Sequence, residues 1–272
     1  MIEIGIYNNL SNDEYHADPA ISRTGMMMFD QSPYKYWANY LNPSRPSKEM
    51  TPAMTFGKAF HEFILEPEEF KKHFAPEPPK VLLKNVGREQ YEAYKKHCAE
   101  LEATNKIILS DDEYLTLLKM RDALMNNSAA KELIEGAVYE SSYFWKDEHS
   151  GLMLKARPDI LHENMIVDLK TCADASPRAF QYAIADGGYH VQGAIIRDGV
   201  HELQGRLINN VINIAIEKKY PYSIGIYLID EYALEAGQAK YKQICLDMKE
   251  SINSQTFGDY GIQTLGLPKW AI

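Results

Sequence analysis

The feature that most constrains the fold is a change of pattern at about residue 137, where helical periodicity gives way to short strand-like runs. Two aromatic and β-branched runs, AVYESSYFWKD and GLMLKARPDIL, are joined by the segment DEHSG, which predicts a β-hairpin. A compact apolar strand, MIVDLKT, follows, and a strand pair formed by NVINIAIEKK and YSIGIYLID is expected around Lys219–Pro221. The second half of the chain is therefore expected to build a β-sheet.

Helical patterns surround these strands. Ser22 is expected to cap a helix over about 23–41, which Pro33 divides in two. The first 21 residues show little periodicity and are expected to form an irregular arm. Further helices are expected over about 53–65, 87–104, 111–126 and 231–254, with one or two more over 177–197.

This order of elements predicts an α/β chain in which a mixed central β-sheet is flanked by helices. The length of 272 residues is ample for a buried core, and we expect a single domain over 1–272. Its expected parts are a helical amino-terminal part over about 1–135, a sheet core over about 136–254 and a tail over 255–272.

The chain lacks the marks of a membrane or secreted protein. No run of 18 apolar residues occurs, and the start, MIEIGIYNNLSNDEYH, lacks the basic and apolar regions of a secretory signal. Cys98, Cys172 and Cys245 are odd in number and lie far apart, so they fit neither a disulfide framework nor a CxxC metal site. We therefore expect a cytoplasmic location.

The net charge of −9 weighs against a protein that binds nucleic acid by electrostatics alone. Carboxylates that collect divalent cations also count toward an acidic total, so the evidence against nucleic acid is weak. If this chain handles DNA, we expect a local basic surface, bound cations, or an assembly that concentrates positive charge on one face.

The clearest chemistry lies in Asp159, Asp168 and Lys170. Side chains two residues apart in a strand share a face, so Asp168 and Lys170 are expected to project together. An antiparallel return through 162–164 would bring Asp159 beside Asp168. Two carboxylates that converge beside a lysine indicate a site for a hard cation such as Mg²⁺.

Such a site supports the metal-assisted hydrolysis of a phosphodiester, because the cation polarises the phosphoryl oxygen and lowers the pKa of bound water. Lys170 could orient the attacking water or deprotonate it, and the second role needs a pKa well below the ordinary value of about 10.4. The alternative interpretation is a surface ion pair, since Asp-x-Lys is common in strands by chance.

His61 is a further candidate ligand, because it shares a helix face with Gly57, four residues earlier. A glycine inside a helix costs about 1 kcal/mol relative to alanine, which suggests that another backbone or a ligand approaches Gly57 closely. A neutral imidazole on that face could bind a metal ion. The structural alternative is a hydrogen-bonded histidine between a helix and the sheet.

These segments form a recognisable series. The order GKAFHEFILEPEEF, ARPDI, IVDLKT, YHVQGA and a closing LGLPKWA resembles the RecE-type exonucleases (exodeoxyribonuclease VIII). These enzymes belong to the PD-(D/E)xK nuclease superfamily, which also contains lambda exonuclease. The likeness spans nearly the whole chain, and its joint order and spacing are far more specific than any single motif.

The resemblance implies a restriction-endonuclease-like core and the degradation of linear double-stranded DNA from its 5′ ends, which leaves 3′ single-stranded tails. It implies Mg²⁺ as the cofactor, with Mn²⁺ as the alternative. It also implies a homo-oligomeric ring, for which a tetramer is favoured over a trimer, and a single-strand annealing protein of the RecT type as partner in phage-type recombination. A ring would reconcile DNA binding with the acidic total, because only its channel needs to be basic.

The resemblance also implies a set of site residues. His61, Asp159, Asp168 and the backbone carbonyl of Leu169 would ligate the metal ion. Lys170 would position the nucleophilic water, and Gln192 would help to hold that water or the scissile region. One departure is Ile196, where many relatives have a tyrosine four residues after this glutamine. A contact through that tyrosine hydroxyl is therefore in doubt.

Two further expectations concern the amino-terminal part. Ser22, Arg23 and Thr24 at a helix start could bind a terminal 5′-phosphate, although a plain helix cap is the alternative. Some superfamily relatives hold an iron–sulfur cluster with a cysteine where this chain has Ser32. Three scattered cysteines cannot supply four ligands, so no cluster is expected.

Two other functions stay open on this evidence. A structure-specific or restriction-type endonuclease could use the same fold, and a catalytically silent DNA-binding subunit could retain it. Silence is disfavoured because Asp159, Asp168 and Lys170 are all present, and degenerate members usually lose one of them.

Overall fold

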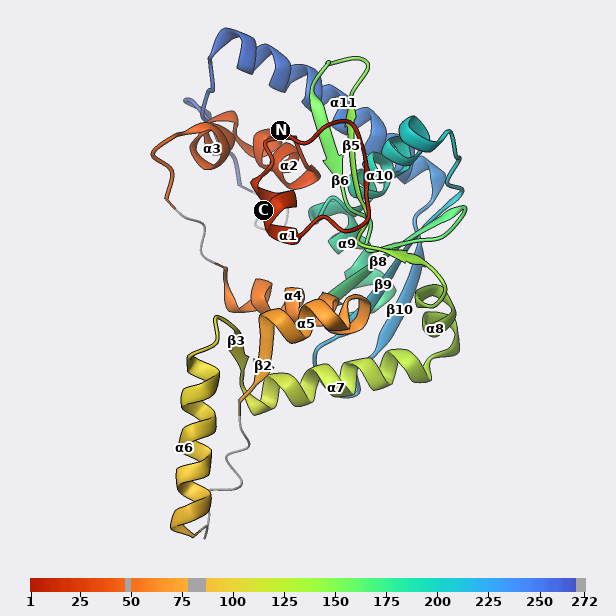
Figure 1. Cartoon of the computed structure of the whole chain (residues 1–272). Helices are drawn as coiled ribbons and strands as arrows, with labels where there is room; N and C mark the ends of the chain where they lie inside the picture. Colours follow the sequence, from red (N-terminus) through yellow and green to blue (C-terminus); the bar gives the residue numbers. More distant parts are fainter. Residues whose placement is uncertain (47–49, 78–86, 268–272) are drawn as a thin grey trace.

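The computed structural model of the chain describes residues 1–46, 50–77 and 87–267, so the last five residues of the expected tail lie outside it (Figure 1). The central sheet is mixed, as predicted, because β8 and β9 are parallel and the other pairs are antiparallel. Its strands, in spatial order, are β10 (Ile224–Leu228), β9 (Asn210–Glu217), β8 (Met165–Cys172), β7 (Ile160–Leu161) and β4 (Val138–Tyr139).

The predicted hairpin is confirmed, but it forms a sheet of its own. β5 (Ser142–Lys146) pairs antiparallel with β6 (Met153–Ala156), and β1 (Gly5–Tyr7) adds to the other side of β5. The expectation of an irregular arm over 1–21 is therefore wrong. A three-residue strand is too short to show a period, and its pairing depends on a strand more than 130 residues away. A short parallel ribbon joins β2 (Phe74–Pro76) to β3 (Ile107–Leu109).

The predicted helices are present, with three additions in the described residues. The short α1, α5 and α8 escaped prediction because six or seven residues hold too little periodicity, whereas η1 lies within the helix predicted from Pro33 to about residue 41. The helices are α1 (Asn12–Ala17), α2 (Arg23–Gln31), α3 (Pro33–Tyr36), the π-helix η1 (Trp37–Leu41), α4 (Pro52–Leu65), α5 (Pro67–His73), α6 (Arg88–Glu102), α7 (Asp111–Asn126), α8 (Ser128–Ile134), α9 (Pro177–Asp186), α10 (Tyr189–Gln204) and α11 (Glu231–Ser254).

Two layers of helices bury the central sheet between them (Figure 1). One layer contains α4, α5, α7 and α8, and the other contains α2, α10 and α11. Because alternate residues of a strand face opposite sides, Ile166 of β8 joins the core under α10, whereas Val167 and Leu169 join the core under α4. Asp168 and Lys170 therefore lie on the α10 side of the sheet.

Figure 1 shows α6 extending away from the rest of the molecule, next to the β2–β3 ribbon. Among the helices of the described residues, none combines the length and the apolar character that a bilayer crossing requires. The division of 1–272 into a single domain with three parts stays a prediction.

The expectation for Gly57 needs correction. A Cβ atom built on Gly57 would meet no atom of the described chain within 4 Å, so no other backbone approaches it. The close approach lies elsewhere, at Gly237 in α11. A Cβ atom there would lie 2.6 Å from the backbone oxygen of His190 at the start of α10, so only glycine lets these two helices pack as they do.

These two glycines predict opposite effects of the same substitution. Gly237→Ala should lower the free energy of unfolding by about 1–3 kcal/mol, because it forces α10 and α11 apart. Gly57→Ala should raise it by up to about 1 kcal/mol, because alanine favours the helix and meets no obstacle. Urea unfolding of both variants checks this pair, and a Gly237→Ala chain as stable as the wild type would contradict the packing.

Candidate active site

The turn after β7 brings the two predicted carboxylates together. β7 returns antiparallel onto β8 with Ile160 opposite Val167, which places Asp159 opposite Asp168, as predicted. The Asp159 Oδ2 atom accepts a hydrogen bond of 2.8 Å from the Leu169 N–H. Because β7 pairs with β8 through only two residues, the β8 edge beyond Val167 faces no other strand of the described chain on this side, and the Leu169 backbone turns toward that open edge.

His61 and Asp159 meet a third group, Glu140, that the sequence analysis missed. The ligand atoms of these three side chains all lie within 4.8 Å of one another, and His61 Nδ1 is 3.5 Å from Asp159 Oδ2. Glu140 follows β4 with a positive φ of 50°, and its N–H donates to the Asp159 carbonyl at 3.2 Å. One imidazole and two carboxylates at this spacing fit a divalent cation.

A sequence signal for Glu140 did exist. It is the only carboxylate in the run AVYESSYFW, where every other residue is aromatic, small or β-branched. An acid in the middle of a strand-like run marks either a solvated face or a functional position.

Asp168 belongs to a second, more basic cluster. Its Oδ1 accepts from the Gln192 amide at 2.7 Å, and its Oδ2 accepts from Lys170 Nζ at 2.6 Å and from the Asn213 amide at 3.2 Å. Lys170 and Arg23 both donate to Gln192 Oε1, at 3.4 and 3.1 Å. The structure thus brings Asp168, Lys170 and Gln192 together and adds Asn213, which lies opposite Asp168 on β9.

Burial and the charges of the two clusters shift the pKa values of Asp168 and Lys170. Burial raises the pKa of Asp168, and the nearby Asp159 charge adds to this, while the Lys170 ammonium opposes both. Burial lowers the pKa of Lys170, but the carboxylates of Asp168 and Asp159 outweigh that effect and leave it above its ordinary value. In this arrangement Lys170 is an ammonium ion that donates hydrogen bonds to Asp168 and Gln192. The base role considered in the sequence analysis stays a prediction, because a cation beside Asp159 and Asp168 would offset the carboxylate charges that raise the pKa of Lys170.

Glu140 experiences the strongest acidic field. Withdrawal from water and repulsion by Asp159 and Glu66 raise the pKa of Glu140 well above its ordinary value, and Arg157 only partly compensates. A divalent cation between these carboxylates would remove the repulsion. The acid-rich cluster is therefore poised to exchange a proton for a cation.

Two adjoining clefts open onto these clusters and share Tyr15, His16 and Arg157 in their walls. The first, of about 240 Å³, contains His61, Glu140 and Asp159. The second, of about 260 Å³, is lined by the three predicted phosphate-binding residues together with Lys170 and Gln192. These three residues are Ser22, Arg23 and Thr24.

Arg157, two residues before Asp159 in the sequence, serves the fold. Its Nε donates to Ser142, and its two terminal nitrogens donate to Asn12 and to the Leu10 carbonyl, at 2.7–2.9 Å. These bonds fasten the amino-terminal arm against the hairpin. Ser22 is the N-cap residue of α2, as predicted, but its side chain makes no capping hydrogen bond.

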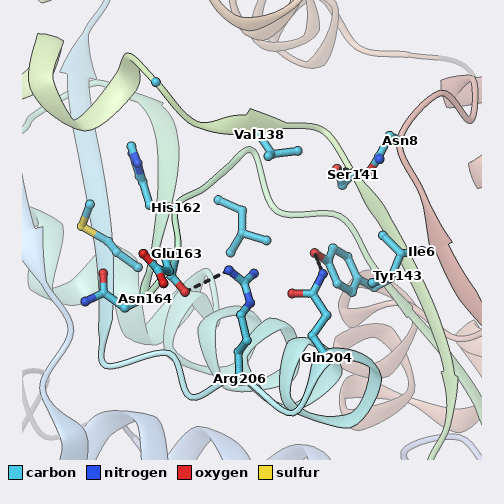
Figure 2. A pocket seen from close by; sticks show the side chains of 13 residues that line it. Ile6, Asn8, Val138, Ser141, Tyr143, His162, Glu163, Asn164, Gln204 and Arg206 are labelled. Atoms are coloured by element: carbon cyan, nitrogen blue, oxygen red, sulfur yellow. Dashed lines mark hydrogen bonds between the residues drawn. The ribbon is translucent and has the colours of Figure 1, made fainter.

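A larger cavity, of about 960 Å³, lies elsewhere and contains none of the predicted site residues. Figure 2 shows Arg206, two residues after the end of α10, facing Glu163, and Gln204, the last residue of α10, facing Tyr143. Arg206 donates to the Glu163 carbonyl at 3.0 Å, and Gln204 donates to the Tyr143 hydroxyl at 3.3 Å.

Comparison with known proteins agrees with this geometry. Residues 22–261 match the sequence model of a family described as a PDDEXK-like domain of unknown function (DUF3799), and this range contains all residues of both clusters. No curated protein sequence matches significantly.

One solved structure shows the same fold. A crystal structure of a protein proposed to be an exonuclease, from Eubacterium rectale, has 14% sequence identity, covers 96% of each chain and gives a TM-score of 0.65. A phage-related exonuclease from Haemophilus somnus (10% identity, 68% of this chain and 92% of that chain, TM-score 0.35) is more distant. So is an alkaline exonuclease from Laribacter hongkongensis (15% identity, 63% and 84%, TM-score 0.30). The two distant structures are too dissimilar to define the fold of this chain. The family match and the first structure confirm the predicted fold class.

The raised pKa of Glu140 predicts that protons compete with the cation. A protonated carboxyl binds no metal, so the affinity for Mn²⁺ should rise with pH as Glu140 loses its proton. Glu140→Gln should weaken binding at pH 8 by roughly tenfold or more and flatten this pH dependence. Titration calorimetry with MnCl₂ at pH 6 and pH 8 measures both effects.

Glu135→Gln is the matched control, because Glu135 is exposed and paired only with Lys131. Equal Mn²⁺ affinity of the Glu140→Gln and wild-type chains would leave Glu140 with a structural role only.

Proposed function

The chain belongs to the family of PDDEXK-like domains of unknown function (DUF3799), and on this premise we propose that it is a metal-dependent nuclease that hydrolyses the phosphodiester bonds of DNA. The observation that carries the proposal is the meeting of two clusters at the open edge of β8. One cluster joins a histidine to two carboxylates, one of which is Asp159, and the other joins Asp168 to a lysine and an amide.

The first cluster suits the cation. His61, Glu140 and Asp159 would hold Mg²⁺, or Mn²⁺ as the alternative, and the predicted ligands Asp168 and the Leu169 carbonyl adjoin them on β8. When bound, the ion supplies Lewis-acid polarisation of the phosphodiester and lowers the pKa of water. The proposed ligand set thus gains Glu140.

The second cluster suits the nucleophile and the phosphate. Lys170, held by Asp168 and Gln192, would orient the attacking water through its N–H donors. Gln192 would fix the ammonium and bind the scissile region. Arg23, with Ser22 and Thr24 in the wall of the same cleft, would bind the terminal 5′-phosphate of the substrate.

We further propose that the chain degrades one strand of linear duplex DNA from its 5′ end and leaves a 3′ single-stranded tail. The resemblance to RecE-type exonucleases supports this, and so does the structural neighbour from Eubacterium rectale, which is described as a proposed exonuclease. A homo-oligomeric ring, a tetramer before a trimer, and a RecT-type annealing partner belong to the same proposal. An endonuclease of the same fold is the second candidate, and a silent DNA-binding subunit is the third.

A comparison of linear with closed circular duplex DNA in the presence of Mg²⁺ tests the proposal. We expect the linear duplex to yield mononucleotides and one surviving strand, while the closed circle stays intact because it offers no end. Cleavage of the circle would identify an endonuclease. Digestion of neither substrate, with Mg²⁺ or with Mn²⁺, would refute the nuclease function.

The role of Lys170 predicts a separation of binding from catalysis. Lys170→Ala should lower the cleavage rate by about 10²–10⁴-fold, because the water loses its orienting donor, and should leave Mn²⁺ affinity intact. Lys58→Ala is the control, since Lys58 lines the neighbouring cleft but pairs with Glu62. Single-turnover rates and calorimetry measure the two effects, and a parallel loss of Mn²⁺ binding would contradict the assigned role.

A further inference from the structure

A surface beyond the carboxyl end of β8 combines basic side chains with exposed tyrosines. We call it the strand-end surface. It is built by the first turns of α9 and by the turn between β9 and β10, and its members are Arg178, Tyr182, Lys218, Lys219 and Tyr220. Of its three basic residues, Arg178 and Lys219 are exposed and Lys218 is half-buried.

Hydrogen bonds hold the two parts of this surface together. The Lys218 N–H donates to the Cys172 carbonyl at 3.4 Å, and the Ala175 N–H donates to Glu217 at 2.9 Å. The Tyr227 hydroxyl also donates to the Ala175 carbonyl. The loop that enters α9 and the β9–β10 turn therefore form one unit at the end of β8.

The tyrosines of this surface lie largely in solvent. Tyr220 is 87% exposed and Tyr182 is 63% exposed, which is unusual for rings of this size. Tyr222 packs partly into the core under α4 and touches Tyr220 edge-on, with ring centroids 6.5 Å apart. Tyr222 thus contacts the Tyr220 ring on one side, while most of the Tyr220 ring is exposed to solvent.

Three basic side chains gather at this end although the whole chain carries a net charge of −9. In the described part of the chain, none of Arg178, Lys218 and Lys219 takes part in an ion pair with a carboxylate. The acids nearby are engaged by the backbone, because Glu217 accepts from Ala175 and Asp174 accepts from the Ser176 N–H at 2.8 Å.

We infer that the strand-end surface binds a single strand of DNA, with phosphates on its cations and unpaired bases stacked on Tyr220 and Tyr182. Aromatic rings beside basic side chains are the means by which proteins hold single strands without reading their sequence. The site adjoins this surface: Lys170 is in register with Ala215, and Lys218 follows three residues later, about 10 Å along the strand. The inference rests on the proposed nuclease function for the identity of its ligand.

Binding of a fluorescein-labelled oligothymidine of about 20 nucleotides, measured by anisotropy in EDTA, tests this inference. Tyr220→Ala should weaken binding roughly five- to hundredfold, whereas Tyr220→Phe should stay within about twofold because the stacking face is kept. The double substitution of Lys218→Gln with Lys219→Gln should reduce the salt dependence, log Kd against log salt, by about 1.4.

Tyr232→Ala and Lys249→Gln on α11 are the matched controls, because both residues are exposed and lie on a different element. A wild-type chain that does not bind the oligonucleotide overturns the inference. So does wild-type affinity in Tyr220→Ala, or a loss that Tyr232→Ala reproduces. An equal loss of affinity for blunt duplex DNA would assign the surface to duplex and overturn the single-strand claim.

The two proposals fail in different ways. Binding in EDTA needs no hydrolysis, so a chain that shows the expected binding pattern but cuts no DNA refutes the nuclease function alone. A chain that cuts linear duplex, yet binds the oligonucleotide equally well with and without Tyr220, refutes the strand-end surface alone.

Discussion

The arrangement of the site depends on one hydrogen bond, from the Leu169 N–H to the Asp159 carboxylate. β7 pairs with β8 through only two residues, and the carboxylate then takes over the pairing that a longer strand would have provided. A buried N–H without a partner would cost about 1–3 kcal/mol, so this bond holds Asp159 in place as well as satisfying β8. It also leaves an open edge that side chains from both helical layers can reach.

The two layers bring different chemistry to that edge. His61 comes from α4 on one face of the sheet, whereas Gln192 and Arg23 come from α10 and α2 on the other. The result is an acidic half around Asp159 and a more basic half around Asp168. A cation and a phosphate can therefore be held side by side, which a site on a single face of the sheet would not allow as readily.

Several basic groups near the site serve the fold and are not free for a substrate. Arg157 donates its hydrogen bonds to the amino-terminal arm and the hairpin. Lys155 donates to the backbone carbonyls of Tyr15 and Asp18. Both cations also lie over the Tyr15 ring.

Local sequence pattern was enough to predict the hairpin, the main helices, the mixed sheet and the approach of Asp159 to Asp168. Hydrophobic periodicity, turn residues and a short antiparallel return each depend on residues that are close together in the sequence. The same pattern placed Lys170 beside Asp168. The positions of Glu140 and Asn213 in the site, and the pairing of β1, could not be predicted from local pattern. Each depends on which distant strands are neighbours and on their register. Only the packed sheet decides that, because the free energy that selects one register comes from burying both faces together and not from any single segment.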